Sequence, residues 1–146
     1  MEEDILALAP AYKLNRERAI FVATLLGGPL PGAFLVAENF RRLGEPEKVK
    51  WTWGIAILLL AGVVAAFVFI PAFSHIPNYV LPLIFVVIAR ILIKRYQEPA
   101  IQRHISEGGQ IYSVWRAVAV GLIATALILG VVFGAGLLAD NLANPG

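Results

Sequence analysis

Three long runs of uncharged residues dominate the pattern of hydrophobic and polar positions along this chain. The longest run, residues 51–89, holds 39 consecutive residues without Asp, Glu, Lys or Arg, and residues 19–37 and 117–139 hold 19 and 23. Apolar stretches of about 18 residues or more are typical of helices that cross a lipid bilayer. The pattern therefore predicts an all-α integral membrane protein, formed by a single membrane domain over residues 1–146.

Turn-forming residues divide these runs into four predicted transmembrane segments. We expect the segments at about residues 20–37, 53–73, 80–93 and 115–138. The polar turn at residues 74–79 separates the second segment from the third. Residues 97–112 form the main polar stretch, in which Pro99 can begin a short helix and Gly108 and Gly109 can end it. We expect this stretch to lie at the cytoplasmic membrane interface.

Composition supports lipid as the main surroundings. Hydrophobic residues make up 59% of the chain and charged residues 15%, whereas a soluble domain carries about 25% charged residues. The net charge of +2 does not indicate nucleic-acid binding, because the cations flank the apolar runs and do not form one stripe. The absence of cysteine excludes disulfides, thiolate metal sites and cysteine nucleophiles.

The positions of the basic residues predict the orientation of the chain. The loop between the first two segments and the stretch between the last two are both rich in Lys and Arg, whereas the turn near residue 75 and the tail after residue 138 have none. Basic loops stay in the cytoplasm. We therefore expect these two loops inside and the C-terminus outside. The acidic start of the chain does not resemble a cleaved signal peptide, so the first segment is expected to be retained.

The first segment is interrupted by the sequence GGPLPG, which removes backbone donors and weakens the helix at its middle. The residues concerned are Gly27, Gly28, Pro29, Pro31 and Gly32. A full crossing with a kink is the preferred interpretation, because a proline within a helix usually bends it. The alternative is a re-entrant hairpin that turns at the break. Only the hairpin leaves the basic residues near position 16 in the cytoplasm, in agreement with the orientation rule.

The broken segment has two functional interpretations. A discontinuous helix can expose backbone groups that hold ions near the bilayer centre. Small residues such as Gly28 and Gly32 also allow close packing between helices, which is the preferred interpretation. Gly130 and Gly134 offer the last segment a similar contact face, within the monomer or between copies.

Few polar groups are candidates for chemistry. Glu38, Asn39 and Arg90 fall near the predicted cytoplasmic ends of their segments, where we expect a Glu38–Arg90 pair more than a proton relay. His104 and His75 should face opposite sides of the membrane, so they cannot share a metal ion. His104, Glu107 and Ser113 do not have the spacing of a catalytic triad. No cofactor or metal is therefore expected.

Two sequence motifs resemble those of a family of small uncharacterised bacterial multi-spanning membrane proteins. The first is A-T-x-x-G-G-P-L in the opening span, followed here by Glu38, Asn39 and Phe40. The second joins residues ahead of the last span, namely His104, Gly108, Gly109, Ser113, Trp115 and Arg116. The resemblance implies a multi-pass protein of the bacterial inner membrane but no activity, substrate or cofactor. Pro31 departs from the family pattern, in which a small residue is expected.

Three classes of function remain. A non-enzymatic structural or accessory membrane module is preferred, because the chain has small-residue faces, short loops and no catalytic constellation. Its partners would be the lipid bilayer and a second copy of the chain or another membrane protein. The alternative is an oligomeric channel or transporter that uses the broken first segment. An enzyme is least favoured, since no nucleophile and base are recognisable.

Overall fold

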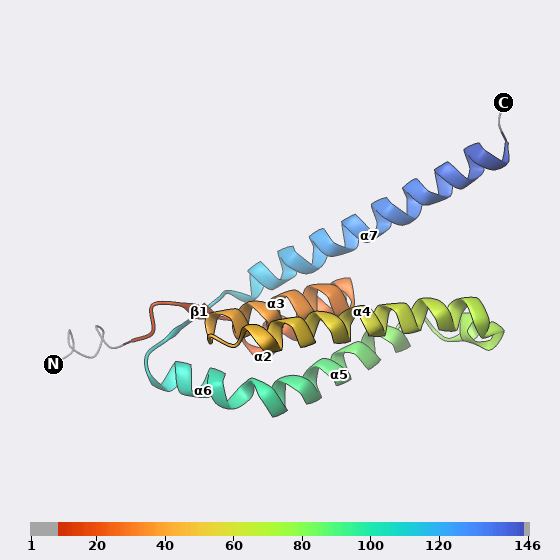
Figure 1. Cartoon of the computed structure of the whole chain (residues 1–146). Helices are drawn as coiled ribbons and strands as arrows, with labels where there is room; N and C mark the ends of the chain where they lie inside the picture. Colours follow the sequence, from red (N-terminus) through yellow and green to blue (C-terminus); the bar gives the residue numbers. More distant parts are fainter. Residues whose placement is uncertain (1–8, 145–146) are drawn as a thin grey trace.

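The computed structural model describes residues 9–144, and these are mostly helical (Figure 1). In chain order the elements are β1 (Lys13–Leu14), α2 (Glu17–Gly27), α3 (Pro29–Arg42), α4 (Pro46–Phe69), the 3-10 helix η1 (Pro71–His75), α5 (Val80–Tyr96), α6 (Glu98–Ser106), β2 (Gln110–Ile111) and α7 (Val114–Ala143). The predicted helical class is thereby confirmed, with two short strands added.

Two of the four predicted spans meet the requirements of length and composition for crossing a membrane. These are α4, with 24 residues, and α7, with 30 residues. At 1.5 Å per residue they measure roughly 36 and 45 Å, more than the hydrocarbon thickness of about 30 Å. The predicted third span corresponds to α5, whose 17 residues give roughly 25 Å. The predicted interfacial stretch contains α6, which begins beside Pro99 and ends before Gly108 as expected.

The first segment is not one kinked helix, so the preferred interpretation of a single bent crossing is wrong. Instead, α2 and α3 form a helical hairpin that reverses at Gly28, whose φ is +77°. The start and end of the hairpin meet, since the backbone N of Asn15 lies 2.7 Å from Oδ1 of Asn39. Glycine adopts this positive φ without strain, and Pro29 has no N–H with which to continue α2. The two residues together therefore end one helix and begin the next.

The hairpin forms the centre of the fold. Its first helix, α2, packs between α5 and α7, and its second helix, α3, packs on α4. The core is made of small and aliphatic side chains from these helices, namely Ala19, Ile20, Ala23, Leu35, Ile93 and Ala117. Gly121 allows α7 to approach α2 closely, because a Cβ atom there would lie 2.9 Å from Cβ of Leu26.

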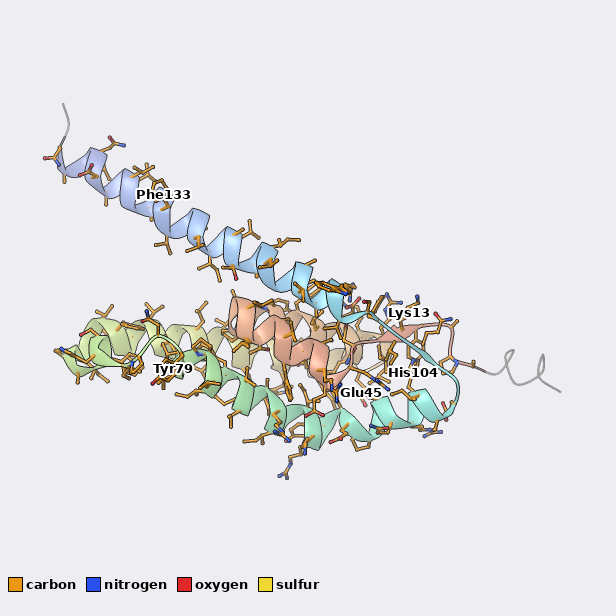
Figure 2. All side chains as sticks on the ribbon, turned by 180° about the vertical axis from the view of Figure 1, so that it is seen from behind. Lys13, Glu45, Tyr79, His104 and Phe133 are labelled. Atoms are coloured by element: carbon orange, nitrogen blue, oxygen red, sulfur yellow. The ribbon has the colours of Figure 1, made fainter. Side chains whose placement is uncertain are left out.

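The polar segments gather at one end of the molecule. Lys13 of β1 pairs with Gln110 of β2 in parallel register, which joins the residues before the hairpin to those after α6. The η1 turn and the C-terminal end of α7 lie at the opposite end (Figure 1). The distal half of α7 leaves the other helices, as the labelled Phe133 illustrates in Figure 2. Its large apolar side chains are exposed, Phe133 to 71%.

Candidate functional site

A buried polar cluster lies at the base of the α2–α3 hairpin. It consists of Asn15, Glu38, Asn39, Gln97 and Arg116, which come from four separate parts of the chain. The three amide residues are at most 1% exposed. Buried amides are stable only when their donors and acceptors are paired. The geometry of the cluster therefore depends on which groups pair with which.

Asn15 and Asn39 close the hairpin through reciprocal hydrogen bonds. The backbone N–H of Asn15 donates to Oδ1 of Asn39 at 2.7 Å, and Nδ2 of Asn39 donates to the backbone oxygen of Asn15 at 2.9 Å. The side-chain amide of Asn15 also donates to the backbone oxygen of Leu35 at 3.3 Å. Asn39 thus satisfies the two backbone groups of Asn15, in the way that a neighbouring strand would.

Gln97 extends the cluster to the junction between α5 and α6. Its Oε1 accepts a hydrogen bond from Nδ2 of Asn39 at 3.2 Å, and its Nε2 donates to the backbone oxygen of Val36 at 2.9 Å. Gln97 is the residue between the two helices, so its side chain is directed by the corner that they form. This one amide therefore fixes the α5–α6 corner against α3.

Glu38 and Arg116 form the charged part of the cluster. Nη1 and Nη2 of Arg116 donate to the two carboxylate oxygens of Glu38 at 2.8 and 3.0 Å. Nη1 also donates to Oδ1 of Asn15 at 3.1 Å. The guanidinium group lies over the ring of Tyr112, 4.0 Å from its centre. Paired hydrogen bonds and aromatic stacking are the interactions that arginine makes better than lysine.

The surroundings of Glu38 keep its carboxyl group ionised. Glu38 follows the apolar run of residues 19–37, at the polar end of the hairpin. Burial alone would raise the pKa of Glu38, but hydrogen bonds from Arg116 and Asn15 and the charges of Arg116 and Arg42 together lower this pKa below its ordinary value. Glu38 and Arg116 therefore form an ion pair at neutral pH.

The predicted pairing of Glu38 with Arg90 is wrong. Nε of Arg90 lies 3.8 Å from Oε1 of Glu17, at the start of α2, and the Arg90 side chain is 59% exposed. The helix α5 runs beside α2, whereas Glu38 faces α7, so the arginine that reaches it belongs to α7. An exposed pair of this kind contributes little to stability.

The residues of the broken sequence are packed against one another and against α7. A Cβ atom on Gly27 would lie 2.7 Å from Cγ of Pro31 and 2.8 Å from the backbone oxygen of Gly121, and one on Gly32 would overlap Oγ1 of Thr24. The hydroxyl of Thr125 donates to the backbone oxygen of Leu26 at 2.6 Å, which satisfies one terminal carbonyl of α2. The residues on either side of the turn are therefore closely packed, whereas Gly28 at the turn itself has open surroundings.

His104 is buried beside β2, against a backbone oxygen and an aromatic ring. Its Nε2 lies 2.9 Å from the backbone oxygen of Gln110, and its ring stacks on that of Tyr12 at 4.9 Å. Gly109 leaves space for the ring, since a Cβ atom there would overlap it. Gly108 supplies the preceding turn with φ of +79°. These two predicted glycines and His104 thus form one packing unit.

The remaining predicted residues have separate structural roles. The hydroxyl of Ser113 caps α7 by accepting a hydrogen bond from the backbone N of Trp115 at 3.3 Å. The side chain of Trp115 is exposed. Of the residues in this motif, Arg116 is the one that enters the polar cluster.

Among residues 9–144 no group of three or more His, Asp or Glu side chains is placed to hold a metal ion.

Asn15 and Gln97 were not predicted as site residues. Each is a single amide in a polar stretch, and such residues are usually solvated. The only signal in the sequence is position, because each adjoins an apolar segment. Because this positional signal is weak, the motifs could identify Glu38, Asn39 and Arg116 but not the residues that join them.

Comparison with family models, curated proteins and solved structures finds no match for this chain. The family resemblance of the two motifs therefore stays a prediction. The fold itself defines a mostly helical protein in which two helices are long and apolar enough to cross a membrane.

Proposed function

We propose that this chain is a non-enzymatic structural module of the bacterial inner membrane. In this arrangement α4, α5 and α7 cross the bilayer, and the α2–α3 hairpin enters from the cytoplasmic side and returns to it. The C-terminus is then outside. The proposal agrees with the exposed apolar surfaces of α4 and α7, which in a soluble protein would favour aggregation.

The re-entrant hairpin resolves a conflict in the distribution of charge. Lys13, Arg16 and Arg18 precede the hairpin, and a single crossing would place them outside together with the η1 turn. A hairpin leaves them on the same side as the basic loop that precedes α4, in agreement with the preference of Lys and Arg for the cytoplasm. The pairing of Lys13 with Gln110 supports the same placement.

The pairing within the polar cluster is the observation that carries a structural role. Asn15, Asn39, Gln97 and the Glu38–Arg116 pair use their hydrogen-bonding groups to join α3, α7 and the α5–α6 corner. Among residues 9–144 the one buried side-chain polar atom without a partner is Nδ1 of His104. A catalytic or ion-conducting site needs polar groups that are free to contact substrate or water. The cluster instead stabilises a rigid hairpin.

A second copy of the chain is the proposed protein partner. A Cβ atom built on Gly130 or Gly134 meets no other atom within 4 Å, so the small-residue face that these two glycines form on distal α7 is open in the monomer. Faces of this kind let two membrane helices approach closely. The module would then associate through α7 while the hairpin stabilises each copy.

Ion flux after reconstitution into liposomes separates this proposal from a channel. The wild-type protein should give no potassium flux above that of empty liposomes. Gly28→Leu tests the hairpin turn, and Gly44→Leu is its matched control, because Gly44 has a similar φ of +75° and equally open surroundings in the α3–α4 loop. The contrary outcome is a potassium flux in the wild type that Gly28→Leu abolishes and Gly44→Leu preserves, with folding and oligomer size unchanged. This result would refute the structural role and support a channel.

A further inference from the structure

An apolar groove of about 330 Å³ lies between α3, α4 and α5. The helices α4 and α5 are joined by η1 and separate with distance from it, and each packs mainly on the α2–α3 hairpin (Figure 1). Most of the lining side chains are apolar, among them Val36, Phe40, Ile55, Leu59, Phe85 and Ile88. Lys48, Trp51, Tyr96 and Gln97 line its polar end.

The dimensions of the groove match one hydrocarbon chain. Along α4 it extends from Lys48 to Leu59, which is roughly 16 Å at 1.5 Å per residue. This length is about half of the 30 Å hydrocarbon thickness, or one leaflet of the bilayer. The groove therefore has the length of one lipid tail and an apolar lining along that length.

The polar end of the groove has the residues that a lipid headgroup meets at an interface. Lys48 lies beside Glu45, with Nζ 2.7 Å from Oε2, but its side chain remains 47% exposed and can also reach a phosphate. Lys94 and Arg95 lie at the same end of α5, are exposed, and form no ion pair with any residue in the described range 9–144. Lysine and arginine at this depth attract anionic lipids.

We propose that this groove holds one acyl chain of an anionic phospholipid from the cytoplasmic leaflet, with the headgroup phosphate beside Lys48. The inference rests on the proposed membrane placement and adds a ligand class to it. The lipid fills the groove between the two helices and α3. It would thereby complete the packing of the module.

Trp51 provides a direct test, because it lines the polar end of the groove. In the Trp53→Phe/Trp115→Phe background Trp51 is the sole tryptophan. Phosphatidylglycerol with brominated acyl chains, added to the purified full chain in dodecyl maltoside micelles, should quench its fluorescence saturably at about one lipid per chain. Ala89→Phe fills the groove and should raise the lipid concentration for half-quenching at least tenfold. Ala126→Phe, on the exposed face of α7, is the matched control and should have no effect.

Lys48→Gln tests the headgroup separately, on an exposed side chain whose replacement leaves the core intact. It should reduce the preference for phosphatidylglycerol over phosphatidylcholine about fivefold. Quenching that Ala89→Phe does not weaken, or equal affinity of the wild type for the two lipids, would overturn the proposal.

Flotation with liposomes distinguishes failure of the proposed membrane placement from failure of the proposed lipid site. A chain that does not float refutes the membrane placement, whereas a chain that floats without saturable quenching refutes only the lipid site.

Discussion

Arg116 holds both carboxylate oxygens of Glu38, at 2.8 and 3.0 Å, across 78 residues of sequence. The arginine lies in the first turn of α7 and the glutamate lies near the end of α3, so the pair joins the last described helix to the central hairpin. Asn15 contacts both members of the pair, which brings the start of α2 into the same contact. This polar contact and the packing of Ala117 and Gly121 on α2 together hold the first half of α7, while its other end is free.

Loss of the Arg116 guanidinium should destabilise the protein more than loss of an ordinary surface charge. The two side chains are 32% and 12% exposed, between the limits of buried and surface ion pairs. We expect Arg116→Gln to lower the free energy of unfolding by about 1–3 kcal/mol, because it leaves Glu38 partly buried without its partner. Thermal unfolding in detergent measures the change.

A double-mutant cycle provides the control for this prediction. Glu38→Gln combined with Arg116→Gln should be less destabilising than the sum of the single variants, since both charges are then removed. Arg103→Gln interrupts an exposed pair with Glu107 and should change stability by less than about 0.5 kcal/mol. Additive effects in the cycle would show that Glu38 and Arg116 do not stabilise the fold together.

The ion pair should also make stability depend on pH. The pKa of Glu38 is lowered in the folded protein by Arg116 and Asn15, which outweigh its burial. A carboxyl group with a depressed folded pKa contributes stability above its unfolded pKa and loses it as the pH falls through the folded pKa. Unfolding temperatures in detergent should therefore fall below about pH 4.5. Glu38→Gln should flatten this dependence, and an equal slope in both proteins would contradict the prediction.

The close contact between the two arms of the hairpin should be visible in a pair of substitutions. Gly32→Ala places a methyl group against Oγ1 of Thr24 and should cost about 1–3 kcal/mol through overpacking. Adding Thr24→Ala removes the hydroxyl and should restore part of this loss. Gly54→Ala on α4 is the control, because a Cβ atom there meets nothing within 4 Å. Thermal unfolding of the wild type and these three variants is the measurement, and a harmless Gly32→Ala would exclude the close contact.

The helical class and the position of the break could be predicted because both depend on local sequence. Long apolar runs indicate helices wherever they pack, and Gly28 followed by Pro29 weakens a helix in any context. The direction of the chain after the break could not be predicted, because tertiary contacts decide it. A bent helix and a hairpin share the same local sequence, and the hairpin is closed by Asn15, whose partner Asn39 lies 24 residues away.

The partner of Glu38 could not be predicted from the sequence for a related reason. Both Arg90 and Arg116 lie near the polar ends of helices, at distant positions in the chain. Choosing between them requires the rotation of α5 and α7 about their axes, which apolar runs without clear periodicity do not specify. The structure places Arg90 beside Glu17 instead. Motifs therefore identified the charged residues but not their pairing.

Side-specific labelling should distinguish the re-entrant hairpin from a single crossing. Because the chain has no native cysteine, Lys13→Cys and Ser74→Cys each introduce one exposed thiol. A membrane-impermeant maleimide added to intact cells should label Ser74→Cys in η1. It should not label Lys13→Cys at the start of β1. Lysis should make both accessible. Labelling of Lys13→Cys from outside would refute the hairpin topology and with it the proposed orientation.

The free half of α7 should mediate self-association through its glycine face. Gly134→Ile adds a branched side chain where two helices would approach, and we expect it to weaken association of the protein in bilayers at least about tenfold, or 1.4 kcal/mol. The monomer should be unaffected, because a Cβ atom at Gly134 meets nothing within 4 Å and isoleucine has the higher helix propensity. Energy transfer between labelled copies in liposomes measures the association. Val132→Ile, an exposed position on the same helix, is the matched control, and equal weakening by both variants would assign the effect to lipid-facing bulk and not to the glycine contact.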